Sequence, residues 1–512
     1  MKTLTFTGFL LFFISNAILS QTPGELDLTF GDDGISVYDF DGKDETVLGI
    51  AVQDDGKIIT VGYTYNDVNR DCLITRHLEN GDLDMDFGIG GKIISDFGFD
   101  ADTYADVIIR DGGKFLCAGY LSNATDYDFL LTQYNEDGTL DTDFGTDAGM
   151  TVLDVDGDDV LRSIRIDGEG RIVVAATTGD GAPDCAVVRY TENGIPDPTF
   201  SSDGCAQISG FGFSSDITTE LIILPDNKIA VCGITFTGLG NRFAVMRLNE
   251  NGTMDNSFSG DGIDVPDFGT ALEAATGIFL QGDKLLVGGD VFTGNINLGF
   301  VRYNDDGTLD NSFSTDGKLD IDITGTTEYS GNMILQPDGK FLIGGYTWNG
   351  ENFDALLTRL NADLTPDITF GTDGYVITGV SDTLENIWET VLQPDGKIIC
   401  GGTTHNGLNY DYLMIRYNSG LEVGIENTEV VKPEYLLFPN PMSEVANLEF
   451  ENPQHENHTF LLFNAKGELV QAINNVSGEN MEISKGKLPT GLYFFQLGNE
   501  GYIKYSGKLM IE

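Results

Sequence analysis

The chain has 512 residues and is strongly acidic, with 28 Lys and Arg residues against 81 Asp and Glu residues and a formal net charge of −53. A surface of this charge repels phosphate backbones and anionic lipid headgroups, which disfavours nucleic-acid binding and electrostatic docking on membranes. Hydrophobic residues make up 41% of the chain and aromatic residues 10%. This is ample material for packed cores, so the acidity does not indicate disorder.

Residues 1–20 are typical of a secretory signal peptide. Lys2 is followed by an apolar stretch over residues 6–19 and by small residues before Gln21. A short basic start, about 7–15 apolar residues and a small residue at the cleavage point define such a peptide, whereas a membrane anchor needs about 20 apolar residues. We expect cleavage after Ser20, entry into the periplasm and no transmembrane segment; the alternative is a buried N-terminal strand or helix.

Residues 24–420 contain one unit repeated seven times. Its anchor is an aspartate followed three residues later by a phenylalanine, and successive anchor aspartates are 55–58 residues apart. A fixed period of this length is typical of repeat architectures. The anchors are Asp27/Phe30, Asp84/Phe87, Asp141/Phe144, Asp197/Phe200, Asp255/Phe258, Asp310/Phe313 and Asp367/Phe370.

Two further landmarks recur with the same period as the anchor. One is a turn that ends in a base, as in Asp54–Lys57, and the other is a basic residue followed by an aromatic or aliphatic one, as in Arg302-Tyr303. Gln133-Tyr134 is the exception to the second landmark. Three landmarks in register over seven copies indicate one supersecondary unit per copy.

Each unit has short apolar runs without helical spacing. In the first copies we expect four strands, at Val47–Gln53, Lys57–Tyr63, Cys72–Leu78 and Lys92–Phe97, because the runs are rich in β-branched and aromatic residues and are bounded by Gly, Asn or Asp. Four antiparallel strands repeated seven times predict an all-β, seven-bladed β-propeller of four-stranded blades. An open β-solenoid is the alternative, but its coils are only about 20–30 residues long.

The first and last units predict how the ring closes. Ile35–Phe40 follows the first anchor and resembles a fourth strand, while the last unit ends at Arg416-Tyr417 after its third strand. We therefore expect the N-terminal strand to complete the last blade.

Cysteine and histidine offer little for catalysis. The six cysteines contain no CxxC pair, so zinc knuckles and redox dithiols are not indicated, and burial as small hydrophobes is the interpretation that we favour. Export permits disulfides, but their connectivity cannot be deduced. Four histidines leave little from which to build a nucleophilic triad, and we assign no catalytic or metal-ligating residue.

Calcium is the one cofactor that the loops suggest. Asn135–Asp141 and Asp154–Asp159 each place several oxygen ligands within a few residues. The glycine comes too early for an EF-hand loop and the terminal glutamate is missing. The alternative is that these residues cap β-turns by bonding their own backbone.

The units resemble the delta-sixty repeat family, a bacterial β-propeller-like repeat with an LD-x-x-F, DGK and R-Y-N pattern. The pattern is present at Leu309–Phe313, Asp338–Lys340 and Arg302–Asn304. The resemblance covers residues 24–420 and implies a propeller fold without catalytic residues that could be transferred.

After a polar linker, residues 421–434, the composition changes to that of a small β-sandwich over residues 435–512. This module resembles the C-terminal sorting domain of type IX secretion cargo. The resemblance implies that the type IX secretion machinery is a partner and that the protein is secreted or attached to the outer cell surface. The matching motif residues are Pro439, Asn440, Pro441, Gly467, Gly491, Tyr493 and Lys508.

Recurrence suggests which face of the ring is functional. The turns and anchor loops shared by all copies belong on one face, whereas the loops expected on the other face differ from copy to copy and carry aromatic residues among Asn, Asp and Gly. Such aromatics suit a carbohydrate or protein ligand, and the alternative is that they fill gaps between blades. The candidates are Tyr65, Tyr127, Phe236, Trp348, Trp388 (expected at the entrance of a first strand) and Tyr410, joined by Tyr104, Phe292 and Tyr329.

The sequence thus predicts a secreted or surface-displayed recognition protein, monomeric, with an extracellular polysaccharide or surface protein as its ligand. Two alternatives remain. One is a hydrolase that works through carboxylates in the central channel, and the other is a structural adhesion element with no soluble ligand.

Overall fold

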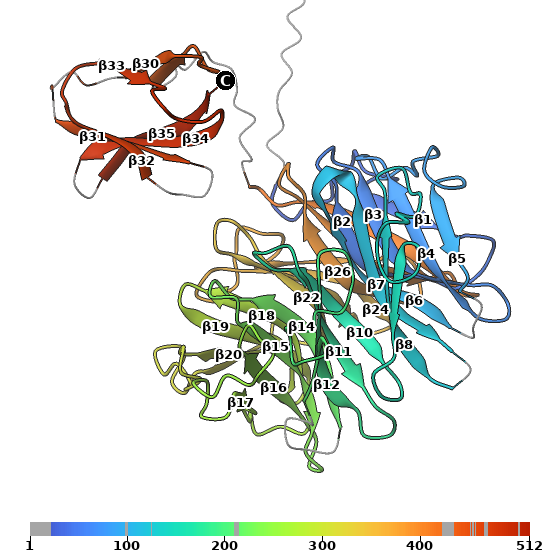
Figure 1. Cartoon of the computed structure of the whole chain (residues 1–512). Helices are drawn as coiled ribbons and strands as arrows, with labels where there is room; N and C mark the ends of the chain where they lie inside the picture. The colour runs from blue at the N-terminus through green and yellow to red at the C-terminus, as the bar shows by residue number, and fades with distance from the viewer. Residues whose placement is uncertain are drawn as a thin grey trace, which may run out of the picture. The chain divides into compact units, whose positions relative to one another are not determined.

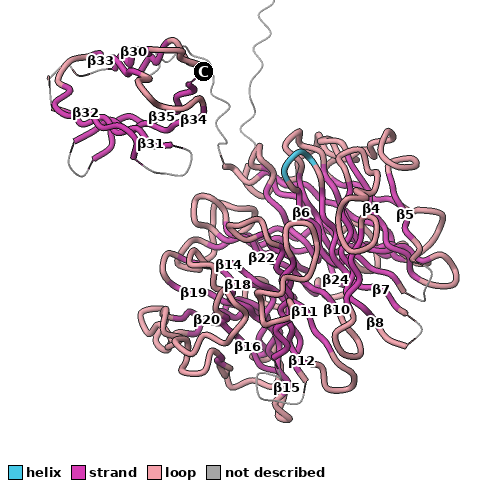
Figure 2. The backbone as a smooth tube through the Cα atoms, in the orientation of Figure 1, coloured by secondary structure: helices cyan, strands magenta, loops and turns pink. Residues whose placement is uncertain are grey.

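The structure, a computed structural model, divides into two compact units, residues 1–423 and 424–512. Figure 2 shows that both are built from strands and loops, with one short 3-10 turn, η1 (Asp111–Gly113). The expected signal peptide, most of the expected linker and Gly467 lie outside the described residues. The described residues are 22–97, 101–123, 125–208, 215–421, 435–450, 452, 455, 457–464, 469–499 and 502–511.

The first unit contains seven four-stranded antiparallel sheets, the blades (Figure 1). Blade 1 consists of β2 (Glu45–Val52), β3 (Ile58–Tyr65), β4 (Arg70–His77) and β5 (Lys92–Ser95), and blade 2 of β6 (Asp102–Ile109), β7 (Phe115–Ser122), β8 (Tyr127–Tyr134) and β9 (Met150–Leu153). Blade 3 consists of β10 (Val160–Ile166), β11 (Ile172–Thr178), β12 (Asp184–Tyr190) and β13 (Cys205–Ile208), and blade 4 of β14 (Asp216–Ile223), β15 (Ile229–Phe236), β16 (Asn241–Leu248) and β17 (Ile263–Asp264).

The remaining blades follow the same order, except that the last one takes its outer strand from the start of the chain. Blade 5 consists of β18 (Glu273–Gln281), β19 (Lys284–Phe292), β20 (Ile296–Tyr303) and β21 (Lys318–Ile321). Blade 6 consists of β22 (Glu328–Leu335), β23 (Phe341–Trp348), β24 (Phe353–Leu360) and β25 (Tyr375–Thr378). Blade 7 consists of β26 (Glu385–Leu392), β27 (Lys397–His405), β28 (Tyr410–Asn418) and β1 (Ile35–Tyr38).

Adjacent blades pack face to face around a ring. The second and third strands of each blade are buried on both faces, which is why they are continuous apolar runs such as Phe341–Trp348 without polar alternation. One apolar core lies between each pair of neighbouring blades. The seventh core joins Ile399 and Met414 of blade 7 to Val47 and Ile58 of blade 1, so the ring is closed. The predicted seven-bladed propeller is confirmed, and the open solenoid is wrong.

The N-terminal strand closes the ring as predicted. β1 pairs antiparallel with β28, with Ile35 opposite Ile415, so that it is the fourth strand of blade 7. A bridge between Leu26 and Tyr417 extends this pairing towards the N-terminus. The last blade is therefore made from both ends of the propeller sequence.

The recurring landmarks of the sequence form one structural lock in each blade. In blade 6, Nε of Arg359 lies 2.8 Å from Oδ2 of the anchor residue Asp367, and its guanidinium lies 4.4 Å above the ring of Phe370. The turn lysine Lys340 adds a second cation 2.9 Å from the same carboxylate. Arg359 also donates to the backbone oxygen of Ser419 in the next blade. The landmarks therefore hold neighbouring blades together.

The six cysteines are free thiols, and five of them are buried in the blade cores. This is the predicted role as small hydrophobes, and none of them forms a disulfide. The cysteines are Cys72, Cys117, Cys185, Cys205, Cys232 and Cys400.

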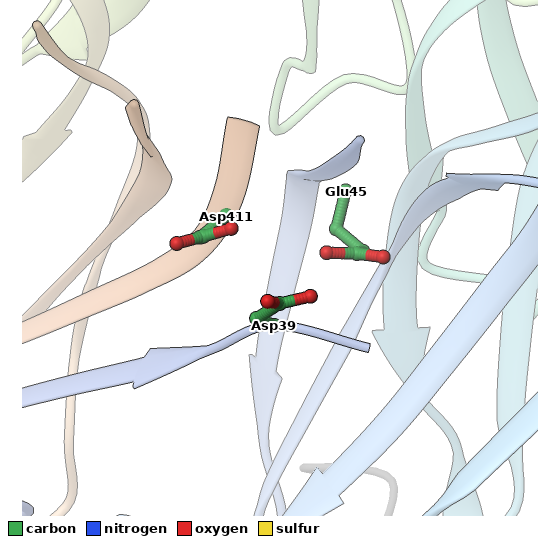
Figure 3. A group of neighbouring side chains, drawn as sticks. All are labelled: Asp39, Glu45 and Asp411. Carbon is green, nitrogen blue, oxygen red and sulfur yellow. The ribbon is translucent and has the colours of Figure 1, made fainter. Parts of the chain in front are cut away.

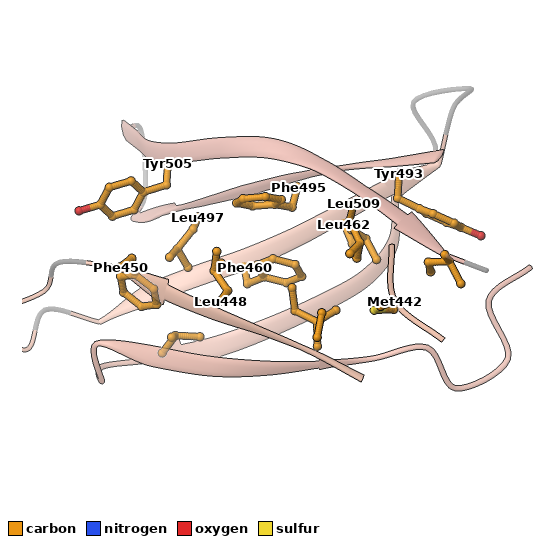
Figure 4. Close-up of a cluster of buried hydrophobic side chains, with 14 residues drawn as sticks. Met442, Leu448, Phe450, Phe460, Leu462, Tyr493, Phe495, Leu497, Tyr505 and Leu509 are labelled. Carbon is orange, nitrogen blue, oxygen red and sulfur yellow. The ribbon is translucent and has the colours of Figure 1, made fainter. Parts of the chain in front are cut away.

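The second unit is a two-sheet β-sandwich. Aromatic and aliphatic side chains from the inner faces of both sheets, among them Phe450, Phe460 and Phe495, form its core (Figure 4). One sheet is β29 (Tyr435–Phe438), β30 (Val445–Phe450) and β33 (Asn480–Ser484), and the other is β32 (Leu469–Val476), β31 (His458–Asn464), β34 (Gly491–Asn499) and β35 (Tyr502–Ile511).

Candidate functional site

Strand direction gives the propeller two chemically different faces. In blade 1 the turn at residues 53–57 and the connection at residues 78–91 lie at one end of the sheet, and the hairpin between Tyr65 and Arg70 lies at the other. All blades share this arrangement. We call the first end the anchor face, because it carries the locks, and the second the variable face.

The axis of the ring is lined by a β-bulge in the first strand of every blade. In β2, Val47 pairs with Gly62 and Gly49 with Val61, so that Leu48 is an extra residue in the ladder. A bulge re-aims the extra side chain. A Cβ on Gly62 would overlap the backbone oxygen of Thr46, so blade 1 needs glycine opposite its bulge, whereas Ala176 holds this position in blade 3. The corresponding bulges lie in β6, β10, β14, β18, β22 and β26.

These bulges surround an axial cavity of about 480 Å³ to which all seven blades contribute. Because the bulged residue differs from blade to blade, the cavity has polar, charged and aromatic walls. The lining residues are Leu48, Ala105, Asp106, Arg162, Arg165, Ile217, Thr219, Glu220, Ile234, Thr276, Ser330, Gly331, Asn332, Trp388 and Glu389.

Three acids of the cavity share one arginine. Nη2 of Arg165 lies 2.6 Å from Oε1 of Glu220, and Nη1 lies 3.4 Å from Oδ2 of Asp106. The third acid, Glu389, accepts a hydrogen bond from Asn332. Burial raises the pKa of Asp106 to about 6, since the charge of Arg165 offsets only part of the desolvation. Burial and the charges of Asp106 and Glu220 hold the pKa of Glu389 well above its usual range.

Arg162, at the bulge of β10, is exposed in the same cavity. Within the described residues it makes no ion pair with a carboxylate. The cavity therefore offers a guanidinium donor beside the carboxyl groups of Asp106, Glu220 and Glu389.

A cluster of five aromatic rings extends from the cavity to the variable face in blades 6 and 7. Trp388 lies 5.8 Å from Tyr346, Tyr346 lies 5.5 Å from Phe353, and Phe353 lies 5.2 Å from Trp348. Tyr329 stacks on Tyr346 at 5.0 Å. Trp348 and Trp388 remain 39% and 37% exposed. We call these five residues the aromatic cluster; it presents two accessible indole rings.

The structure gathers only some of the candidate residues. Tyr65, Phe236 and Tyr410 lie at the hairpins of the variable face and are exposed, but each belongs to a different blade. Tyr127 stacks edge-on against Tyr120 of its own blade, 5.3 Å away.

Two aromatic residues lie elsewhere than expected. Trp388 is not at the entrance of its strand but at the bulge of β26, where it lines the cavity. Tyr104 is fully buried in the core between blades 1 and 2, so its inclusion among the surface candidates was wrong.

The sorting-motif residues support the last strand of the sandwich. The amide of Asn440 donates to the backbone oxygen of Lys508 at 3.0 Å and accepts from the backbone N–H of Met510 at 2.8 Å. The hydroxyl of Tyr493 donates to the backbone oxygen of Pro489 at 2.8 Å. Lys508 itself is exposed. Pro439 and Pro441 flank Asn440, and Gly491 begins β34.

Of the two loops considered for calcium, only one brings acids together. In residues 135–141, Oδ1 of Asp137 accepts from the backbone N–H and hydroxyl of Thr139, at 2.9 and 2.6 Å, which is the turn-capping alternative. In residues 154–159, carboxylate oxygens of Asp154 and Asp159 lie within 4.8 Å of one another and of Asp128, which comes from the neighbouring blade.

A closed ring of seven four-stranded blades around an axial cavity, followed by a β-sandwich, defines a seven-bladed β-propeller protein with a second all-β unit. The propeller repeats match the beta-propeller family described as a domain of unknown function (DUF5122), and the C-terminal module is a secretion system C-terminal sorting domain, matched at residues 436–512. The propeller family matches residues 53–87, 113–144, 170–200, 224–258, 281–313, 336–370 and 393–421.

Solved structures share the propeller fold at low similarity. YCF48 bound to D1 peptide is 11% identical with a TM-score of 0.40, covering 78% of this chain and 99% of its own. Polysaccharide lyase Uly1 is 11% identical with a TM-score of 0.44, covering 78% and 98%. Puromycin hydrolase is 12% identical with a TM-score of 0.42, covering 80% of this chain but only 59% of its own. Since every TM-score is below 0.5, these likenesses say nothing about function.

No match was found among curated protein sequences. The sorting domain indicates export by the type IX route to the cell surface or the extracellular space. In the part of the chain that the structure describes, no helix has the length and apolarity to cross a bilayer.

Proposed function

We propose that the propeller is an extracellular recognition module that binds a neutral polysaccharide on its variable face, along the aromatic cluster and into the mouth of the axial cavity. The observation that carries this proposal is the pair of exposed indoles, Trp348 and Trp388, linked by Tyr346 and Phe353. Tryptophan and tyrosine rings combine a flat apolar face with a polar edge, which suits contact with sugar rings.

The polar walls of the cavity complement the aromatic cluster. Asn332 and Glu389 lie beside Trp388, and Ser330 and Thr276 add hydroxyl groups bonded to each other at 2.9 Å. Sugar hydroxyls need both donors and acceptors, and these side chains supply both. The net charge of −53 disfavours anionic polysaccharides, which is why we propose a neutral one.

Affinity electrophoresis through gels that contain xylan, mannan or a soluble β-glucan tests the proposal. We expect one of these polymers to retard the purified protein, and Trp348→Ala or Trp388→Ala to weaken binding about tenfold, which corresponds to about 1.4 kcal/mol for one lost ring contact. Phe236→Ala is the matched control, because Phe236 ends the second strand of blade 4 as Trp348 ends that of blade 6.

Two results would contradict the proposal. Retardation that is unchanged in both tryptophan variants would place the ligand elsewhere. The same mobility in every gel would favour the structural adhesion element.

A second candidate is a hydrolase that uses the cavity carboxylates. The specific observation is that Asp106 and Glu389 line the same cavity and that burial raises the pKa of both carboxyl groups, as is common at catalytic sites. Release of reducing ends by the wild type, lost in Glu389→Gln with retardation retained, would support catalysis over simple binding.

A further inference from the structure

A ring of buried carboxylates lies between the blades near the variable face. One acid stands at, or directly before, the first residue of the first strand in every blade, and each is at most 1% exposed. Successive members are 57, 57, 57, 57, 55 and 57 residues apart. These interblade acids are Glu45, Asp102, Asp159, Asp216, Glu273, Glu328 and Glu385.

One oxygen of an interblade acid has a structural role. Oε2 of Glu45 accepts the backbone N–H of Phe40 at 3.3 Å, and Oδ2 of Asp159 accepts that of Val155 at 2.7 Å. The same bond forms to Asp102, Glu273, Glu328 and Glu385. This bond ties the loop that leaves one blade to the start of the next.

The second oxygen is often left without a bond. In the described part of the chain, Oδ1 of Asp102 and Oε2 of Glu273, Glu328 and Glu385 have no hydrogen-bond partner. Buried polar atoms are nearly always satisfied, so these four oxygens lack a partner that a buried carboxylate normally has. At Glu45 and Asp159, by contrast, the hydroxyls of Thr64 and Thr178 donate to the second oxygen.

At two interfaces, further acids from the preceding blade surround the interblade acid. Asp128 and Asp154 join Asp159 between blades 2 and 3, and one oxygen from each lies within 4.8 Å of the others. Asp128 is only 7% exposed, and its Oδ1 has no hydrogen-bond partner among the described residues. We call these three residues the 2/3 cluster.

Between blades 7 and 1, Asp39, Glu45 and Asp411 repeat the arrangement, again with one oxygen from each within 4.8 Å of the others. Figure 3 shows the three carboxyl groups facing one another from three separate segments. We call these residues the 7/1 cluster.

The interface between blades 4 and 5 supplies its own cation. Arg242 occupies the position of Asp128 and Asp411, directly opposite the end of the second strand. Its Nε lies 3.2 Å from Asp267, and its Nη1 lies 3.8 Å from the interblade acid Glu273. The same pocket therefore accommodates a positive charge, provided by the chain where the third acid is absent.

We propose that the 2/3 cluster and the 7/1 cluster each bind a calcium ion. All ligands are carboxylate oxygens, which suit a hard divalent cation. In each cluster the three oxygens lie within 4.8 Å of one another, which is close enough for all three to contact one ion. Asp39 and Asp154 are exposed and open each cluster to solvent.

The two ions have a structural consequence. Each bridges neighbouring blades, and the ion of the 7/1 cluster joins the segment after β1 to β28 and β2, at the closure of the ring. An exported protein meets millimolar calcium, so affinities of about 10⁻⁴–10⁻³ M suffice for occupancy. The inference does not depend on the polysaccharide.

Calorimetric titration of CaCl₂ into the chelator-treated, purified protein tests this inference. We expect two ions per chain in the wild type, one in Asp39→Asn or Asp154→Asn, and none in the double variant, because these exposed acids can be neutralised without unfolding the blade. Asp267→Asn is the matched control, since it is the equivalent acid at the interface where Arg242 is present, and it should still bind two ions.

A melting curve gives a second readout. Added CaCl₂ should raise the melting temperature of the wild type and of Asp267→Asn, but not that of the double variant. The inference is overturned if no saturable calcium binding occurs up to about 10 mM, which is tenfold above the weakest expected Kd, or if the double variant still binds two ions. Equally tight binding of MgCl₂ would overturn the assignment to calcium.

Discussion

Replacing the first anchor residue, Asp27→Asn, tests the electrostatic lock at the ring closure. The side chain is fully buried, and its Oδ2 lies 2.7 Å from Nη2 of Arg416 and accepts a hydrogen bond from Lys397. Burial alone would raise the pKa of Asp27, but the hydrogen bonds from Lys397 and Thr29 and the charge of Arg416 lower it from 3.8 to about 2. At 1.36 kcal/mol per pKa unit, this shift adds about 2.5 kcal/mol to the free energy of unfolding at neutral pH.

We expect urea unfolding at pH 7 to show a loss of about 2–3 kcal/mol in Asp27→Asn, because asparagine keeps the acceptor for Thr29 but leaves two cations uncompensated. Since the pKa is lowered in the folded state, the carboxylate stabilises the fold fully above about pH 4, and the contribution is lost as the pH falls through about 2. The difference between wild type and variant should therefore shrink between pH 4 and pH 2.

Asp316→Asn serves as the control, because Asp316 is an exposed aspartate that pairs with the Lys318 ammonium at 3.8 Å and accepts from the Lys318 backbone N–H at 3.2 Å, an acceptor that asparagine retains; it should change stability by less than about 0.5 kcal/mol. If Asp27→Asn unfolds at the wild-type urea concentration at pH 7, or if its deficit is the same at pH 2, the lock does not stabilise the ring in the way argued.

Three further outcomes follow from the fold. Deletion of residues 26–40 removes β1, Asp27 and the buried Phe30 from the closure and should lower the melting temperature by about 10 °C; an unchanged value in scanning calorimetry would show that the clasp is dispensable. Because all six cysteines are free thiols, dithiothreitol should leave the melting temperature unchanged, and a fall would reveal a disulfide. Arg165→Ile leaves Asp106 and Glu220 without their shared cation, so its melting temperature should drop more at pH 7 than at pH 5, where Asp106 is already protonated; equal drops would contradict the shared-cation interpretation.

The architecture could be predicted from the sequence because its determinants recur. Asp and Phe appear in each copy at nearly constant spacing, Arg in all but the second and the turn lysine in all but the third. The structure shows that they contact one another, as Asp367, Phe370, Arg359 and Lys340 do. Counting strands from these landmarks left one blade short by one strand, which predicted the pairing of β1 with β28.

The interblade acids could also have been found in this way. They recur at a spacing as regular as that of the anchors, but the sequence around them varies from copy to copy. In a chain with 81 acidic residues, they cannot be distinguished from the other acids by residue type alone. Their burial is the distinguishing property, and burial depends on the preceding blade covering the start of each first strand. Only the packed ring makes Glu45 and Asp411 neighbours.

The axial cavity could not be predicted, for a different reason. The side chains of Leu48 and Trp388 line the axial cavity because the register of each first strand, β2 and β26, shifts by one residue at the bulge. A bulge of this kind reverses which side chains face the neighbouring blade. Strand propensity alone therefore placed Trp388 at the strand entrance rather than in the cavity.

Within a repeat protein, a departure from the shared pattern is more informative than the pattern itself. Arg165 pairs with Val173 in the register position that holds Ile108 in blade 2 and Ile222 in blade 4. The fold accepts an apolar side chain there, so the blade does not require a guanidinium. An arginine at this one position, paired with Asp106 of blade 2 and Glu220 of blade 4, adds a charge that closure of the ring does not need. The ligand site that we propose at the axis would account for that charge, and it is separate from the recurring acids between the blades.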